Sequence, residues 1–108
     1  MSRTDLMRGT LDLLILRALT TGPDHGLGIA RRVEQITQGA FRVNPGSLFP
    51  ALHRLAQKGW LTAEWGRSET NRKAKYYELT PDGRHQLEAE ARNWKRISVA
   101  IDLALDTA

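Results

Sequence analysis

The segment from Pro45 to Leu61 constrains the fold more than any other part of the chain. Within it, Leu48, Leu52 and Leu55 recur at the i, i+4, i+7 spacing that buries one face of a short helix. We expect the opposite face to carry small or polar side chains, namely Ser47, Pro50, Ala51 and Arg54. Two strand-like runs joined by a basic loop follow directly. A short helix with a small, polar outer face beside a cationic hairpin suits a DNA groove better than an active site.

The composition indicates one soluble domain. With 108 residues, of which 41% are hydrophobic and 26% charged, the chain supports a single domain plus one extra element. It has no cysteine, which excludes disulfides and cysteine-ligated zinc. The apolar run 11–19 contains Asp12 and Arg17 and is far shorter than the roughly 20 residues of a membrane span. We therefore expect a cytoplasmic protein that does not enter a membrane.

The positive charge is concentrated in the middle of the chain. Residues 39–79 hold seven Lys or Arg and three Glu, whereas 1–38 contribute a net charge of +1 and 80–108 of −1. The net charge of +4 is therefore the excess of the helix and hairpin region, as expected where a protein meets phosphates. The alternative interpretation is a mildly basic, solvated surface.

Apolar periodicity predicts two helices before this segment. The first is apolar on two sides, with one stripe at Leu11, Leu14, Ile15 and Ala18 and a second at Leu6, Leu13 and Leu16. A helix of this kind has two surfaces to bury, and the second stripe is a candidate dimer contact. Residues 20–23 end this helix, and Asp24 is the expected N-cap of the next. That helix is expected to pack through Leu27, Ile29, Ala30, Val33 and Ile36 and to end at Gly39.

The third helix should begin near residues 44–47, with Ser47 as its cap and Pro50 in its first turn. Gly59 would end it. Alternation then predicts a half-buried strand containing Leu61, Ala63 and Trp65, and a second strand containing Tyr77 and Leu79. The polar, cationic stretch 66–74 between them is expected to form an exposed hairpin tip.

Thr80-Pro81 is a cap followed by proline at the first helical position, which predicts a new helix running to the C-terminus. Its apolar seam consists of Leu87, Ala91, Trp94, Ile101 and Leu105, with Ile97 beside it and Ser98 interrupting it. Such a helix lacks a partner within the chain, so it is expected to pair two copies. The expected class is mainly α (α+β), a winged helix-turn-helix at 1–80 followed by a C-terminal dimerisation helix at 81–108.

Four motifs follow one another along nearly the whole chain: Gly9-Thr10-Leu11-Asp12-Leu13-Leu14-Ile15-Leu16, His25-Gly26-Leu27-Gly28-Ile29, Gly46-Ser47-Leu48-Phe49-Pro50-Ala51-Leu52-His53-Arg54-Leu55 with Gly59-Trp60-Leu61, and Lys75-Tyr76-Tyr77-Glu78-Leu79-Thr80-Pro81-Asp82-Gly83. In this order and spacing they resemble the PadR-like transcriptional regulators. The resemblance implies a homodimeric bacterial repressor that binds a roughly palindromic operator and is typically released by a small molecule. Where the family usually has a tyrosine that approaches the DNA backbone, this chain has Phe49, which cannot donate that hydrogen bond.

In a winged helix the third helix enters the major groove with its N-terminal residues nearest the bases. The predicted DNA contacts of this helix are therefore Asn44, Gly46, Ser47, Phe49, Pro50, Ala51, His53 and Arg54. Those of the hairpin, to phosphates or the minor groove, are Arg67, Asn71, Arg72, Lys73 and Lys75. Arg3, Arg8, Arg31 and Arg32 are weaker candidates for flanking contacts, since most surface arginines have no special role.

The predicted dimer interface combines the second stripe of the first helix with the C-terminal seam: Leu6, Leu13, Leu16, Leu87, Ala91, Trp94, Ile97, Ile101 and Leu105. Trp94 is interpreted as interface core, or alternatively as the lining of a pocket for a planar small-molecule effector. His25, His53 and His85 lack neighbours at metal-ligand spacing, and no nucleophile and base are arranged for catalysis, so we expect no metal, cofactor or enzymatic activity. The alternative function is a winged-helix protein-interaction module.

Overall fold

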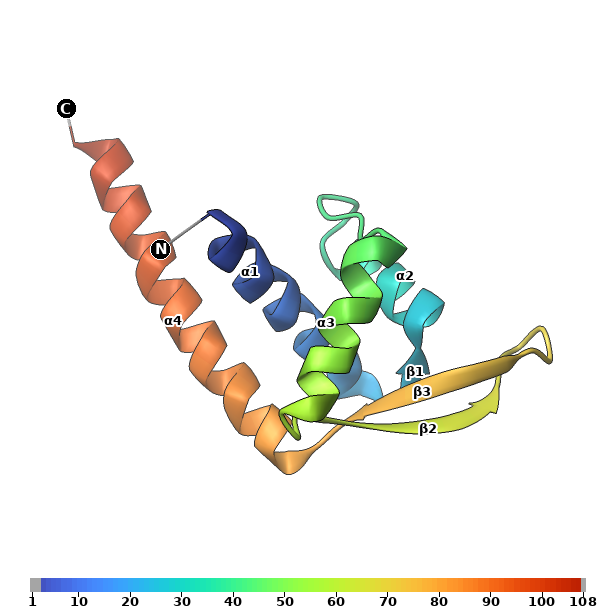
Figure 1. Ribbon diagram of the computed structural model, residues 1–108. Helices are drawn as coiled ribbons and strands as arrows, with labels where there is room; N and C mark the ends of the chain where they lie inside the picture. Colours follow the sequence, from blue (N-terminus) through green and yellow to red (C-terminus); the bar gives the residue numbers. More distant parts are fainter. Residues whose placement is uncertain (1–2, 108) are drawn as a thin grey trace.

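The computed structural model describes the backbone of residues 3–107 and the side chains of residues 9–107. Along the chain it forms α1 (Arg3–Ala18), a short 3-10 helix η1 (Leu19–Thr21), β1 (Asp24–His25), α2 (Gly26–Ile36), α3 (Pro45–Gln57), β2 (Leu61–Arg67), β3 (Lys73–Leu79) and α4 (Pro81–Asp106). Helices α1, α2 and α3 pack together, the β2–β3 hairpin projects to one side, and α4 projects to the other (Figure 1). This mainly helical arrangement is the winged helix that the sequence predicts.

The sheet is antiparallel with the strand order β1-β3-β2. Strands β2 and β3 pair along their whole length, from Leu61 opposite Leu79 to Arg67 opposite Lys73. The two-residue strand β1 pairs with the other edge of β3, placing His25 opposite Tyr76. The sequence analysis did not predict β1. Because β1 leads directly into α2, it ties the start of that helix to the hairpin.

The core lies between the three helices and the base of the hairpin. The stripe predicted for α3 is confirmed, since Leu48, Leu52 and Leu55 are almost fully buried. With Ala51 of the same helix, they pack against the following buried side chains of the other elements: Ile15, Leu16, Ala18, Leu19, Ile29, Val33, Leu61, Tyr77 and Leu79. Burying one such large aliphatic side chain stabilises the fold by about 1.5–3 kcal/mol relative to leaving it exposed.

Two of the helix starts differ from the predictions. His25, not Asp24, is the N-cap of α2, and Asn44, not Ser47, is the N-cap of α3, where its Oδ1 accepts from the Ser47 amide at 2.9 Å. Pro50 consequently lies inside α3 rather than in its first turn. Its missing N–H leaves the Gly46 carbonyl without a helical donor, and because Gly46 is exposed, water can satisfy that oxygen.

Several side chains predicted to be buried lie on the surface instead. In α2, Ile29 and Val33 are buried as expected, but Leu27 and Ile36 are exposed. In β2 only Leu61 is buried, while Ala63 and Trp65 are exposed. The alternation of apolar residues in β2 predicts burial, but the strand extends beyond the helices (Figure 1), and Trp65 in its far half is exposed.

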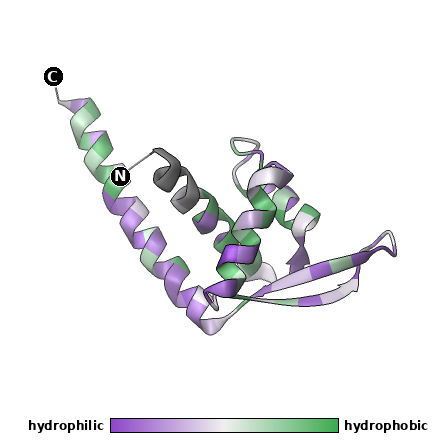
Figure 2. Cartoon of the chain, viewed as in Figure 1, coloured by the Kyte–Doolittle hydropathy of each residue, from purple (hydrophilic) through white to green (hydrophobic). Residues whose placement is uncertain are grey.

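The N-cap predicted for α4 is confirmed, because the Thr80 side chain accepts from the Gly83 amide at 2.9 Å. Gly83 lies so close to the base of the hairpin that a Cβ there would be 2.2 Å from the Trp60 carbonyl oxygen. Leu87 packs against the core. Farther along, α4 is polar in its middle and strongly apolar in its last turns (Figure 2). No helix within the described residues is long and apolar enough to cross a membrane.

One residue of the second stripe predicted for α1 belongs to the core. Leu16 is fully buried in the core, so its assignment to a dimer interface is wrong. Leu13 is half-buried. Leu6, like Arg3 and Arg8, lies outside the residues whose side chains the structure describes.

Candidate nucleic-acid interface

The start and outer face of α3 are open to solvent. Six exposed residues here were predicted as DNA contacts: Asn44, Gly46, Ser47, Phe49, Pro50 and His53. Most are small, so another molecule can come close to the helix backbone. Small side chains at the N-terminal end of a helix suit insertion into the major groove of DNA.

Two further residues predicted to contact DNA from α3 do not lie on this face. Ala51 is only 1% exposed because it lies one turn from Leu48 and Leu55 on the buried side of the helix, so the predicted close approach of Ala51 to DNA is wrong. Arg54 is partly buried and pairs with Asp12 of α1 through its Nη2 atom. Burial raises the pKa of the Asp12 carboxyl, while the Arg54 guanidinium acts to lower it. Arg54 therefore joins α3 to α1, and its guanidinium is engaged by Asp12 rather than free for the predicted contact with phosphates or base edges.

Phe49 links the exposed face of α3 to the start of α2. Its ring lies directly over Gly26, where an added Cβ would be 2.7 Å from Cε1 and 2.9 Å from Cζ of the ring. About half of the ring is exposed. The absence of a side chain at Gly26 thus allows α3 to seat its N-terminal half against the first turn of α2.

The β2–β3 hairpin has one cationic and one acidic face. Side chains alternate along a strand, so Arg67, Lys73 and Lys75 share the face that carries buried Tyr77 at the base of the hairpin. The exposed acidic residues Glu64 and Glu78 lie on the other face. Because Tyr77 faces the helical core, the cations lie on the side of the hairpin turned toward the helices.

Trp65 belongs to the cationic face, and the sequence analysis missed it. The sequence analysis places Trp65 among the apolar residues of a half-buried strand, yet 62% of the residue's surface is exposed. The Nζ atoms of Lys73 and Lys75 lie 4.9 Å and 5.8 Å from its ring centre. Such cation–π contacts hold flexible ammonium groups near one position. The available signal was an aromatic residue far along the first strand of a hairpin whose second strand begins with Lys73 and Lys75.

The hairpin tip forms a compact turn. The Ser68 amide donates to the Arg72 carbonyl at 2.9 Å, and the Asn71 amide donates to the Ser68 carbonyl at 2.8 Å. Asn71 adopts a φ of 60°, a left-handed conformation that asparagine tolerates better than most residues. The Asn71 carbonyl also accepts from Arg67 Nη1 at 3.3 Å. Asn71 therefore shapes the turn that presents Arg72 to solvent.

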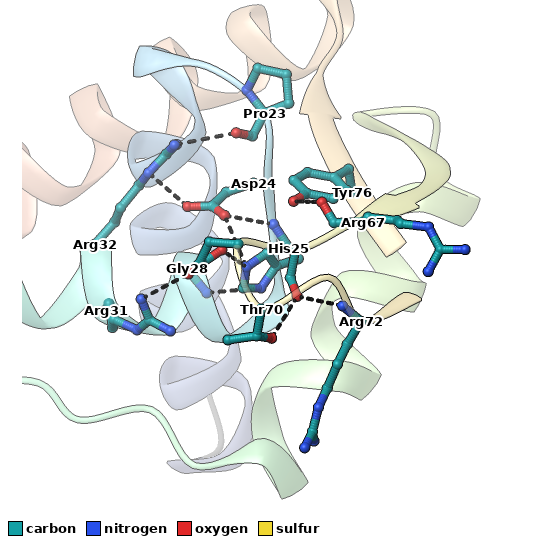
Figure 3. A network of polar contacts seen from close by, with 12 residues as sticks. Pro23, Asp24, His25, Gly28, Arg31, Arg32, Arg67, Thr70, Arg72 and Tyr76 are labelled. Carbon is teal, nitrogen blue, oxygen red and sulfur yellow. Dashed lines mark hydrogen bonds and ion pairs between the residues drawn. The ribbon is translucent and has the colours of Figure 1, made fainter. Parts of the chain in front are cut away.

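A polar network connects this tip to α2 (Figure 3). Glu69 contacts His25 and Arg31, each at 3.3 Å. Its own backbone amide, and then these two side chains, lower the pKa of the Glu69 carboxyl. Arg32 pairs with Asp24 at 3.1 Å and donates to the carbonyls of residues 18, 22 and 23. Arg32 is thus a structural residue in this network, and Arg31 is held by Glu69.

Comparison with known proteins decides the family. The model of the "Transcriptional regulator PadR-like family" matches residues 15–89, which include α2, α3, the hairpin and the start of α4. This chain belongs to the PadR-like family. The resemblance stated from the motifs is therefore confirmed, and so is the winged-helix fold.

This PadR-like protein is similar to proteins from several bacteria. It is 32% identical to the transcriptional regulator Rv3488 of Mycobacterium tuberculosis over 82% of this chain and 78% of that protein. It is 29% identical to an uncharacterized protein X of Lysinibacillus sphaericus over 98% and 97% of the two chains. A transcriptional regulator from Clostridium thermocellum has a similar structure, with a TM-score of 0.80, 26% identity, and coverage of 91% of this chain and 95% of that one.

Family membership identifies the chain as a DNA-binding transcription regulator and not an enzyme, as the sequence predicts. Of the residues predicted for the dimer interface, Ala91 and Ile97 are half-buried, whereas Trp94, Ile101 and Leu105 are exposed. Leu87 contacts the core of its own chain, so it is less available to a partner than predicted.

Proposed function

We propose that this protein is a repressor that binds a roughly palindromic operator as a homodimer. Each copy inserts the N-terminal half of α3 into the major groove, which is about 12 Å wide, and places the cationic face of the hairpin on the adjacent backbone or minor groove. The observation that carries this proposal is that small residues at the start of α3 are exposed and that Arg67, Lys73 and Lys75 share one face of the hairpin. The far end of α4 projects away from the hairpin (Figure 1).

The contacts divide into two kinds. Asn44, Gly46, Ser47, Pro50 and His53 lie on α3 and are assigned to base edges or nearby phosphates. The phosphate-binding set lies on the hairpin and consists of Arg67, Arg72, Lys73 and Lys75, with Trp65 holding two of the lysines. Phosphate contacts supply most of the affinity, and base contacts supply the sequence preference. Phe49 packs on Gly26 and donates no hydrogen bond to DNA.

The C-terminal helix supplies the dimer contact. We assign residues 1–80 to the DNA-binding unit and 81–108 to the dimerisation helix, with an apolar seam of Ala91, Trp94, Ile97, Ile101 and Leu105. Half to three quarters of Ile101 and Leu105 is exposed in the single chain, which is a costly arrangement unless another surface covers them. A second copy provides that surface and spaces two α3 helices along one duplex.

We further propose that a planar small molecule binds beside Trp94 between the two copies and releases the operator. Trp94 is partly exposed in the middle of α4, so its ring is available both to a partner copy and to an aromatic ligand. Because its target is chromosomal DNA, the dimer works in the cytoplasm.

Fluorescence anisotropy with the DNA upstream of the gene that encodes this chain tests the proposal. If each protomer contacts about four phosphates, the dimer contacts about eight, and log K against log salt has a slope near −7. Random duplex of equal length is the control for sequence preference. Absent or salt-insensitive binding would contradict the proposal, and capture of a nuclease-resistant protein partner would then favour a protein-interaction module.

A further inference from the structure

The tip of the hairpin is fastened to the first turn of α2 by one carboxylate. Glu69 Oε2 lies 3.3 Å from His25 Nε2, and Glu69 Oε1 lies 3.3 Å from Arg31 Nη1 (Figure 3). These contacts join residues separated by 44 and 38 positions in the chain. The far end of the hairpin is thus tied to the helix-turn-helix as well as to its own strands.

His25 contacts both elements that this carboxylate joins, α2 and the hairpin. It is only 7% exposed, and its Nδ1 accepts from the Gly28 amide at 3.3 Å, which caps α2. Because Nδ1 is the acceptor, the proton of the neutral ring is on Nε2, which faces Glu69. The ring also packs edge-on against Tyr76 of β3, at 5.5 Å between centres. A single imidazole therefore caps α2, supports β3 and donates to the hairpin tip.

We propose that Glu69 is a positioning residue for DNA recognition, acting through a clamp that consists of Glu69, His25 and Arg31. The clamp fixes the loop 68–72 relative to the start of α2, and Phe49 packing on Gly26 fixes α3 to that same turn. The hairpin tip and α3 are thereby held at one spacing. The inference rests on the proposed function, because it concerns how the two DNA-contacting elements are set relative to each other.

If Glu69 acted only through its negative charge, it would weaken DNA binding instead of supporting it. The carboxylate is exposed among Arg67, Arg72 and Lys73, where it reduces the attraction to phosphates. Removing it should strengthen binding to every duplex if Glu69 acts only as a charge. If the clamp positions the hairpin, its removal weakens binding to the cognate site, where both elements must fit at once. The two roles therefore predict opposite changes in affinity for the cognate site when Glu69 is removed.

The test compares Glu69→Ala with Glu64→Ala in the full chain. Glu64 has the same charge and lies on the acidic face of β2, and within residues 9–107 it makes no ion pair. Two surface contacts of this kind correspond to a change of about three- to tenfold in affinity. We expect E69A to lower affinity for the upstream DNA by that factor, with unchanged or tighter binding to random duplex. For E64A the ratio of the two affinities should stay at the wild-type value.

A second variant cuts the clamp without changing the charge. Asparagine caps helices well but is too short to reach Glu69, so His25→Asn preserves the cap of α2 and loses the contact with the tip. We expect H25N to reduce the ratio of specific to random binding as E69A does. Hydrogen exchange without DNA gives an independent readout, because the Asn71 and Arg72 amides of the loop should exchange several times faster in both variants than in E64A.

Each result has a definite meaning. Equal strengthening of both duplexes by E69A, or unchanged exchange of the loop amides, would overturn the clamp and leave Glu69 as a simple charge. Failure of the wild-type chain to bind any duplex would instead contradict the proposed function, and the loop exchange rates would still decide whether the clamp holds the hairpin.

Discussion

Asp12 of α1 and Arg54 of α3 form an ion pair that joins the first helix to the helix proposed to enter DNA. Both side chains are largely shielded from solvent, Asp12 more than Arg54. Breaking a shielded pair leaves one charge without a partner, which costs more than the loss of a surface ion pair. The contact therefore belongs to the stability of the fold.

We expect Arg54→Ala to lower the free energy of unfolding by about 1–3 kcal/mol, because the partly buried Asp12 carboxylate loses its partner. Once the protein is kept cold enough to stay folded, its affinity for DNA should remain near the wild-type value. Chemical denaturation and anisotropy measure the two effects. His53→Ala, one position earlier and exposed, is the matched control and should leave stability unchanged within about 0.5 kcal/mol. A large loss of affinity by folded R54A would instead indicate direct DNA contact.

The stability of the fold should respond to acid with opposite signs at Asp12 and Glu69. The pKa of the Asp12 carboxyl is raised above 3.8 in the folded protein, so protonation of Asp12 favours folding. The stability that Asp12 contributes is therefore present below that pH and is lost as the pH rises through the folded pKa. The pKa of the Glu69 carboxyl is lowered below 4.5 in the folded protein, so ionisation of Glu69 favours folding. The stability that Glu69 contributes is therefore present above that pH and is lost as the pH falls through the folded pKa. Relative to wild type, Asp12→Asn should lose stability more steeply on acidification, and Glu69→Gln less steeply. Urea denaturation between pH 3 and 6 checks both slopes, and parallel curves for the three proteins would contradict both assignments.

The sequence was most informative where structure depends on neighbours along the chain. The spacing of Leu48, Leu52 and Leu55 places them on one helix face whatever surrounds it, and burial follows. Thr80 beside Pro81 specifies a helix start for the same local reason. The exposure of Ser47, Phe49, Pro50 and His53 on the outer face of α3 was predicted for the same reason, whereas Ala51 and Arg54 were misplaced.

The predictions were wrong where contacts between residues far apart in the sequence determine the position of a side chain. Asp24 is an adequate cap by residue type, but in the fold it pairs with Arg32 and leaves the capping to His25. Arg54 points to Asp12, 42 residues earlier, which no local pattern reveals. Trp65 is exposed because the hairpin outruns the core, a distance that the alternation of residues does not encode.

Gly26→Ala should weaken both the fold and DNA binding, because the new methyl group would collide with the Phe49 ring. Overpacking of this kind costs about 1–3 kcal/mol, and the displaced ring shifts the exposed face of α3. Thermal unfolding and anisotropy measure the two losses. Gly9→Ala is the control, since nothing lies within 4 Å of its added Cβ and alanine favours the helix. The double variant G26A/F49A should recover part of the stability; no recovery would show that the ring is not the obstacle.

Trp65→Ala should weaken binding to cognate and random duplex alike by about two- to fivefold, since Lys73 and Lys75 lose the ring that holds them. Trp65→Phe keeps a ring and should retain most of the affinity.

Lys73→Ala should lower the magnitude of the salt slope by about 1 per protomer, because one phosphate contact disappears. By contrast, Ser47→Ala should change the preference among sequences. Equal losses on both duplexes from S47A would contradict the division between reading bases and binding phosphates.

Ile101→Glu should convert the proposed dimer to a monomer, because a charge in the apolar seam of α4 must lose its water when two copies pair. The monomer retains half of the phosphate contacts, so the slope of log K against log salt should fall to about half, near −3.5. Light scattering with size exclusion and anisotropy measure both changes. Leu103→Glu is the matched control. It lies two residues farther on, about 200° around the helix, and its exposure of 65% is similar to the 50% of Ile101. L103E should stay dimeric, and dissociation of both variants alike would place the contact on another face of α4.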